Sequence, residues 1–184
     1  MSEKGKQNIL HRLLDRYFYL LQHYPLATKS ITSAILAGLG DFISQKLAQG
    51  GQGTIVWRNV GAYAFFNLIV TGPLSHFYYQ WLEKLVPSKV PFAPAVRVLV
   101  DRLIFAPPFL FLVFYLVALF QGHSSEVAMD RIRKSYWISL KMNWRVWTVF
   151  QYIIVNYVPT HYRVLCGNLV GLGWNIYLSS KQTS

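Results

Sequence analysis

Two long stretches without charge constrain this chain more than any other feature of its sequence. Residues 59–82 and 103–125 contain no Asp, Glu, Lys or Arg, and they are 24 and 23 residues long. A helix needs about 20 predominantly apolar residues to cross the hydrocarbon core of a bilayer. We therefore predict an integral membrane protein with an all-α fold, a multi-span bundle of transmembrane helices.

Composition and charge favour a membrane protein over a nucleic-acid-binding protein. The 184 residues suffice for one domain, and charged residues make up 14% of them, against about 25% in soluble domains. The net charge of +11 would also suit a protein that grips nucleic acid, but the long uncharged stretches argue against that class. Basic residues beside membrane spans more often meet anionic lipid headgroups. We therefore expect membrane lipids as partners and no nucleic acid.

The apolar segments divide a single membrane domain, residues 1–184, into several expected helices. Four spans are expected at about 27–48, 60–86, 96–121 and 160–180. The pattern over 8–24 predicts an amphipathic helix, which either lies in the membrane interface or packs on the rest of the protein. An additional helix over 142–158 is expected to be membrane-embedded or interfacial. Whether it crosses stays open, because one helix over 142–178 would measure roughly 55 Å, and the bilayer core is about 30 Å thick.

Polar side chains recur about every four residues along three of these spans and therefore share one face of each helix. Such a face can line a hydrated path in a pore. It can also hold helices together, and small polar residues commonly do so without any channel. Charges inside a bilayer are costly and therefore favour function, with a structural ion pair as the alternative. The candidates for a pore-lining or interhelical polar face are Lys29, Ser33, Asp41, Ser44, Asn67, Thr71, Ser75, Arg145, Arg163, Asn175 and Ser179.

The last expected span also repeats glycine at this spacing. Gly167 and Gly171 stand between Arg163 and Asn175, four residues apart. Small residues at such intervals permit close contact between membrane helices. We therefore expect this face to pack against a neighbouring helix.

Three charged residues open the third expected span and are candidates for a structural ion pair: Arg97, Asp101 and Arg102. Arg97 and Asp101 are four residues apart, a spacing that allows pairing along a helix. A charge in the hydrocarbon region costs at least about 2.5 kcal/mol. We therefore expect Asp101 and Arg102 to pair or to face the interior.

No arrangement of residues predicts catalysis, a cofactor or a metal ion. The five histidines have no metal-ligand spacing, and the single cysteine, Cys166, cannot form an internal disulfide. No Ser-His-Asp spacing, phosphate-binding loop or pair of carboxylates stands out. We therefore expect no enzyme activity, no cofactor and no metal site.

Four blocks of sequence resemble the Mpv/PMP family of small integral membrane proteins. They are YPLATKSITSAILAGLGDFISQ (24–45), VTGPLSHFYY (70–79), DRLIFAPPFL (101–110) and MNWRVWTVFQYIIVNYVPTHYRVL (142–165), in matching order. The resemblance implies four spans, residence in the peroxisomal membrane and both termini in the cytosol. It also implies a pore for passive, poorly selective passage of small water-soluble metabolites.

The resemblance leaves other functions and partners open. The alternative function is a non-transporting scaffold or a lipid-interacting protein of the peroxisomal or mitochondrial membrane. Expected partners are small-molecule solutes, membrane lipids and the import machinery for peroxisomal membrane proteins. A homo-oligomer is an open alternative to a single chain.

Overall fold

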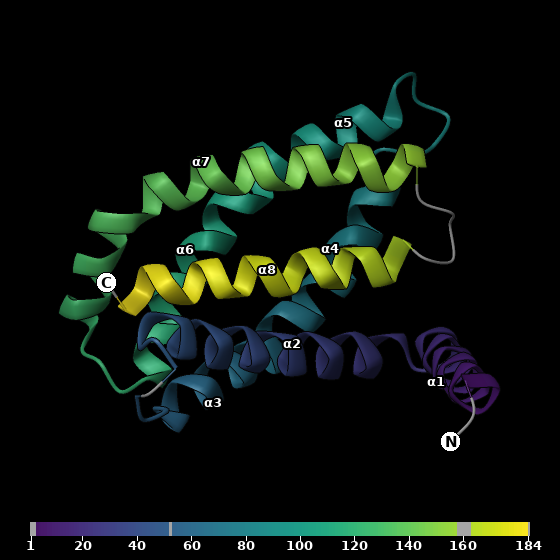
Figure 1. The fold of residues 1–184 in the computed structure, drawn as a ribbon. Coiled ribbons are helices and arrows are strands. Elements are labelled where there is room, and N and C mark those ends of the chain that lie inside the picture. Colours follow the sequence, from purple (N-terminus) through teal and green to yellow (C-terminus); the bar gives the residue numbers. More distant parts are fainter. Residues whose placement is uncertain (1–2, 52, 158–162, 184) are drawn as a thin grey trace.

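The computed structural model describes residues 3–51, 53–157 and 163–183, which are helical over most of their length (Figure 1). No strand occurs in these stretches, so the predicted all-α fold is confirmed. Two short π-helical turns, η1 and η2, interrupt the α-helices. In chain order the elements are α1 (Glu3–His23), α2 (Pro25–Ala48), α3 (Trp57–Phe66), η1 (Asn67–Thr71), α4 (Gly72–Leu85), α5 (Ala93–Val100), η2 (Asp101–Phe105), α6 (Ala106–Phe120), α7 (Ser125–Tyr157) and α8 (Arg163–Thr183).

Helical rods lie side by side in the structure, and α1 lies across one end of them (Figure 1). The rods are α2, the continuous run α3–η1–α4, the continuous run α5–η2–α6, α7 and α8. Helix α2 contacts α3, α4 and α8, while α6 contacts α3 and α7. The rods therefore surround a common interior.

Two rods in the described part of the chain are long and apolar enough to cross a membrane. They are α2, Pro25–Ala48, and the α5–η2–α6 rod, Ala93–Phe120. Helices also run through the other expected spans, as α3–η1–α4 and α8, and α7 includes most of the additional helix. Residues 158–162 lie outside the described residues. The crossing of the bilayer by each separate segment stays a prediction.

Each π-helical turn ends two residues before a proline, which explains its position. Turn η1 precedes Gly72-Pro73, and turn η2 precedes Ala106-Pro107-Pro108. A proline inside a helix has no N–H to donate, and its ring collides with the carbonyl four residues earlier. The wider turn accommodates the ring: the Gly72 N–H bonds to the Asn67 carbonyl, and the Ala106 N–H bonds to the Asp101 carbonyl.

Turn η2 deprives the carbonyl of Arg102 of its usual partner inside the helix, and α7 supplies another. The Ala106 N–H, which would serve this carbonyl in an α-helix, bonds to Asp101 instead, and Pro107 has no N–H. The indole N–H of Trp144 donates to the Arg102 carbonyl at 2.8 Å. Because lipid offers no hydrogen bonds, this contact satisfies a group that would otherwise be costly to bury.

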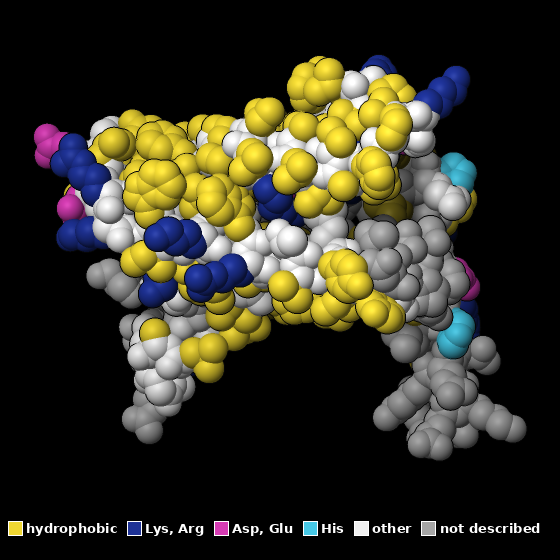
Figure 2. All heavy atoms as spheres, turned by 90° about the horizontal axis from the view of Figure 1, so that it is seen from above, with side chains coloured by type: hydrophobic (Ala, Val, Ile, Leu, Met, Phe, Trp, Pro, Cys, Tyr) yellow, Lys and Arg dark blue, Asp and Glu magenta, His cyan; other side chains and the backbone are white. Residues whose placement is uncertain are grey.

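Large apolar side chains cover the outside of the rods, as expected for a protein surrounded by lipid. On α2, Ile31, Ile35 and Leu39 are all exposed, whereas Ala37 and Asp41 on the opposite side are fully buried. Figure 2 shows hydrophobic side chains over most of one face of the molecule, with Lys and Arg side chains at both ends and some between the left end and the middle. This arrangement places the apolar surface where acyl chains would lie.

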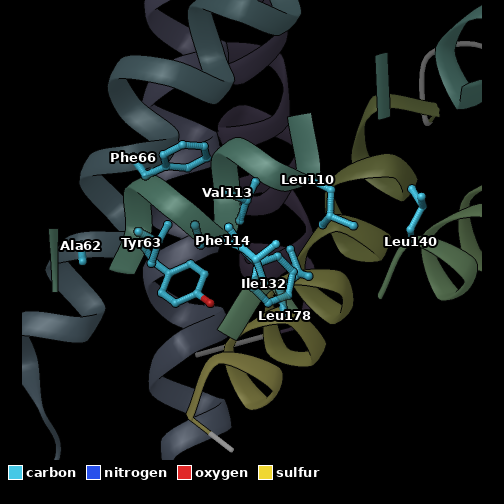
Figure 3. Close-up of a cluster of buried hydrophobic side chains, with 11 residues drawn as sticks. Ala62, Tyr63, Phe66, Leu110, Val113, Phe114, Ile132, Leu140 and Leu178 are labelled. Carbon is cyan, nitrogen blue, oxygen red and sulfur yellow. The ribbon is translucent and has the colours of Figure 1, made fainter. Parts of the chain in front are cut away.

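A cluster of apolar side chains fills the interior where α2, α3, α6, α7 and α8 meet (Figure 3). Phe66, Phe114 and Val117 are fully buried at its centre. Further members are Ala37, Ala62, Tyr63, Leu110, Val113, Ile132, Leu140 and Leu178. This core cluster ties the rods together.

Helix α1 rests against the bundle but keeps apolar side chains exposed. Its Tyr17 hydroxyl accepts a hydrogen bond from the side chain of Asn168 in α8 at 3.1 Å, and the Leu20 carbonyl accepts one from Thr28 in α2 at 3.0 Å. Leu13 is exposed on the outer side. The helix therefore both contacts the protein and presents an apolar face of the kind that enters a membrane interface.

Helices α2 and α8 are neighbours that run in the same direction. Asn168, near the start of α8, contacts Tyr17 of α1, which precedes α2, and Ser179, near the end of α8, contacts Asp41 in the second half of α2. The two ends of the chain accordingly lie at opposite ends of the rods (Figure 1). If both helices cross the membrane, the termini lie on opposite sides. This geometry disagrees with the expectation that both termini face the cytosol.

Candidate functional site

A partly open hollow of about 250 Å³ lies between the rods, and we call it the central cavity. Its walls come from α2, both rods that contain π-helical turns, α7 and α8. Apolar residues such as Leu36, Phe109 and Trp174 supply part of the lining. Lining residues with a polar group include Ser33, Tyr63, Asn67, Thr71, Ser75, Tyr79, Asp101, Arg102, Asn143, Asn168 and Asn175.

Many of the predicted polar residues meet at this cavity, although they come from distant parts of the sequence. Ser33 of α2, Asn175 of α8 and the η1–α4 stripe Asn67, Thr71 and Ser75 all line it. The ion-pair candidates Asp101 and Arg102 line it as well. The three predicted stripes therefore converge through some of their members.

Other predicted residues lie elsewhere. Lys29 and Arg145 are exposed and do not line the central cavity. The side chain of Arg163 lies outside the described residues. Asp41, Ser44 and Ser179 are buried and do not line the central cavity, and Asp41 is hydrogen-bonded to Ser179 of α8.

Several polar atoms in the cavity wall have no hydrogen-bond partner among the described residues. They are the hydroxyls of Tyr63 and Thr71, the Nε of Arg102 and the Oδ1 of Asn143. Tyr63 is only 1% exposed and Asn143 only 8%. Buried polar groups without partners are expensive, so this cavity favours water or a polar solute. It has room for several water molecules, each of which takes about 30 Å³ in the liquid.

Two glycines of α8 leave space in the wall instead of bringing helices together. A Cβ atom added to Gly167 or to Gly171 would meet no other atom within 4 Å, and both residues line the central cavity. The predicted packing role is therefore wrong for these two glycines. Close contact instead occurs at Gly40 of α2, where an added Cβ would lie 2.6 Å from the Cβ of Asn175.

One of the predicted ion pairs forms at the cavity wall. The Nη1 of Arg102 lies 3.0 Å from the Oδ2 of Asp101, and both side chains are largely buried. Arg97 instead donates to the Val86 carbonyl at 2.8 Å and to the Ser88 hydroxyl at 3.2 Å. The expected pair of Arg97 with Asp101 is therefore not formed, because Arg97 turns back toward the segment before its own helix.

Asp41 is held in a polar contact that joins α2 to α8 and to the segment before α3. Ser179 donates to its Oδ1 and Gln45 donates to its Oδ2, both at 2.6 Å. Gln45 also exchanges hydrogen bonds with the backbone of Val56, at 2.7 and 3.2 Å. Asp41 is 0% exposed, so these donors replace the water that a carboxylate would otherwise need.

The sequence predictions missed Tyr79, Asn143 and Asn168 in the cavity wall. Asn168 stands three residues before Gly171 and seven before Asn175, a spacing that keeps it on their face of the helix. Asn143 had no comparable signal. Arg145, the polar candidate on the same helix, lies two residues away, and it is exposed on a different face. Tyr79 continues the stripe of Thr71 and Ser75 by four residues. Its side chain is mostly an aromatic ring, so the polar pattern did not include it.

The chemistry of the site is that of amides, hydroxyls and one ion pair. Among the described residues, no group of three or more His, Cys, Asp or Glu side chains gathers in space. An apolar outer surface, long apolar rods and a polar interior cavity together define a small multi-helix integral membrane protein.

Comparison with known proteins gives this class a family. The chain is 39% identical to Peroxisomal membrane protein 2 of Bos taurus, over 97% of this chain and 94% of the relative. It is 34% identical to PXMP2/4 family protein 3 of Dictyostelium discoideum, over 100% and 98%. It is 33% identical to Peroxisomal membrane protein PMP22 of Arabidopsis thaliana, over 93% and 90%.

The model of the Mpv17 / PMP22 family matches residues 118–179. The chain belongs to the Mpv17 / PMP22 family. It is a protein of the peroxisomal membrane, as are its relatives in cattle and Arabidopsis. No solved structure matches it.

Proposed function

We propose that this protein is a pore for passive, poorly selective passage of small water-soluble metabolites across the peroxisomal membrane. The observation that carries the proposal is the central cavity, with its unpartnered buried polar atoms and its two space-leaving glycines. A helix bundle held together only by packing would fill such a hollow or line it with apolar groups. A polar interior of this kind supports a hydrated path.

The core cluster closes the path at one end in this structure. Phe66 and Leu110 contribute to the cavity wall and also to the core, where Phe114 and Val117 are fully buried. A continuous path through one chain therefore requires these apolar side chains to move. Apolar constrictions of this kind gate channels by excluding water.

Narrowing the central cavity tests the proposal. Gly171→Leu adds a side chain to open space, so it should narrow the path without disturbing the packing of helices. We expect solute release from proteoliposomes to fall by about fivefold or more, since pore diameter limits passage. Single-channel recording in planar bilayers should show a matching loss of conductance.

The matched control is Gly173→Leu, two residues away on the same helix. Gly173 is exposed and also meets no atom within 4 Å of an added Cβ, but it does not line the central cavity. This variant should keep the wild-type rate of solute release. Equal release from wild type, Gly171→Leu and Gly173→Leu would contradict passage through the central cavity, and no release from folded wild type would contradict the pore itself.

The closed end of the cavity favours a second candidate, a membrane scaffold or lipid-interacting protein. In that case the buried polar atoms hold only trapped water, and the fully buried Phe114 and Val117 form a permanent seal. Proteoliposomes that hold sugars of several sizes separate the two candidates. A pore releases the small sugars before the large ones, and a scaffold releases none.

Partners beyond the bilayer belong to the same proposal. The exposed apolar side chains of α2 support direct contact with membrane lipids. We propose small solutes and the import machinery for peroxisomal membrane proteins as further partners, with a homo-oligomer as an open alternative. We propose no catalytic role, because the chemistry of the cavity is that of amides, hydroxyls and the Asp101–Arg102 ion pair.

A further inference from the structure

A second hollow lies beside the central cavity, and the two share part of a wall. This outer groove, of about 680 Å³, lies between the second half of α4, the start of α5 and the last part of α7. The residues that line both hollows are Tyr79 and Asp101. Glu83 and Arg97 also line the outer groove, next to the segment that joins α4 to α5. Two charged groups there indicate that the groove opens toward water.

One side of the shared wall is held firmly by several contacts. Asp101 pairs with Arg102 at 3.0 Å, and Arg102 also donates to the Oε1 of Gln151 in α7 at 2.9 Å. The backbone at this point is tied to α7 as well, because Trp144 donates to the Arg102 carbonyl at 2.8 Å. Asp101 and Arg102 therefore keep their positions independently of Tyr79.

The other side of the shared wall is the Tyr79 side chain, which is joined to Asp101 by one hydrogen bond. The Tyr79 hydroxyl donates to the Oδ1 of Asp101 at 3.2 Å, and the residue is 51% exposed. When this bond breaks, the carboxylate of Asp101 still has Arg102 as its partner. Movement of the ring therefore leaves no buried charge unpaired, which is the large penalty in opening a buried ionic contact.

We infer that Tyr79 is a gate between the outer groove and the central cavity. This inference rests on the proposed pore function. In the closed position the phenol hydroxyl meets Asp101 and separates the two hollows. Rotation of the Tyr79 side chain joins them into one path toward the α4–α5 end of the bundle. Because Asp101 and Arg102 together carry no net charge, the opened gate suits small polar solutes without net charge.

The test measures release of uncharged sugars of increasing size from proteoliposomes that contain the full chain. Tyr79→Phe removes the hydrogen bond to Asp101 and should raise the release rate by about fivefold, the weight of one hydrogen bond. Tyr79→Ala removes the wall and should also admit larger sugars than wild type does. Phe77→Ala is the matched control, because Phe77 is an exposed aromatic residue on the same helix that lines neither hollow. It should behave as wild type.

The outcomes separate the gate from the pore. If Gly171→Leu lowers release but both Tyr79 variants match wild type in rate and size limit, the pore stands and the gate is rejected. If Tyr79→Phe releases sugars faster than wild type and Tyr79→Ala also releases larger sugars, the gate is supported. If neither wild type nor Tyr79→Ala releases any sugar, the gate and the pore both fall.

If the Tyr79→Ala variant fails to fold, a labelling measurement tests the gate instead. Ser75→Cys, in a chain that also carries Cys166→Ser, places one thiol on the wall of the central cavity. Tyr79→Phe should raise its rate of reaction with a water-soluble thiol reagent by about fivefold. An unchanged rate would overturn the gate.

Discussion

The hydrogen bond from Ser179 to Asp41 joins the last helix to the first rod at a fully buried carboxylate. Ser179→Ala should therefore destabilise the protein by about 1–3 kcal/mol, because the carboxylate loses a donor that water cannot replace. The measurement is the melting temperature of purified protein in detergent. Ser180→Ala is the matched control, since that hydroxyl bonds to the Tyr177 carbonyl of its own helix. A similar fall in both variants would contradict a special role for Asp41.

For single residues, the sequence indicated which side chains are polar. It did not indicate which of them line the central cavity and which lie in the contact between α2 and α8. Asp41 and Ser33 belong to one predicted stripe on α2, yet Ser33 lines the central cavity and Asp41 bonds to α8. An α-helix advances about 1.5 Å per residue, so the step of eight positions from Ser33 to Asp41 moves the stripe past one partner helix and onto another. That difference depends on the neighbouring helices, which spacing along one helix does not reveal.

Helices α2 and α8 come close together at Gly40. Gly40→Ala should separate them and cost about 1–3 kcal/mol, because the added Cβ collides with Asn175. Gly61→Ala is the control, since an added Cβ there meets no atom within 4 Å, and it should preserve or raise stability. Thermal unfolding of the two variants makes the comparison. A Gly40→Ala protein as stable as Gly61→Ala would show that the helices have room to adjust.

The π-helical turns explain why the polar stripe of the second rod stays on one face. Four residues of an α-helix turn by about 400°, so a stripe at every fourth position drifts by about 40° per step. The wider turn from Asn67 to Thr71 holds more residues per turn and corrects this drift. Asn67 and Ser75 can therefore line the same cavity. Sequence spacing predicted the stripe but not the π-helical turn.

The glycine face of α8 shows a similar limit of prediction at the level of a whole helix. Small residues every four positions fit both close packing and an open wall. Near Asn175 the face packs against Gly40 of α2, whereas Gly167 and Gly171 face the central cavity. Whether such a face packs closely or lines a cavity depends on the neighbouring helix. The sequence predicted the face of α8, but it did not predict where along that face another helix makes contact.

For the molecule as a whole, the parallel course of α2 and α8 predicts where the termini lie. If both helices cross the bilayer, a cysteine introduced near the N-terminal end at the exposed polar residue Asp15 and one introduced at Lys181 are on opposite sides. In a Cys166→Ser chain, sealed vesicles of known orientation should therefore allow a membrane-impermeant thiol reagent to label one position and not the other. Both positions are in the described residues. Labelling of both from one side would show that α2 or α8 does not cross.

The Asp41–Ser179 contact also bears on how such a chain is made. The two residues are 138 positions apart, so a ribosome completes α2 long before it begins α8. During that interval, the Asp41 carboxylate, which is buried in the finished protein, lacks the hydrogen bond from Ser179. If the helices entered the membrane one by one in the order of synthesis, the Asp41 carboxylate would lie in the hydrocarbon core without the Ser179 donor. A protein built this way is better escorted to its membrane after translation has finished.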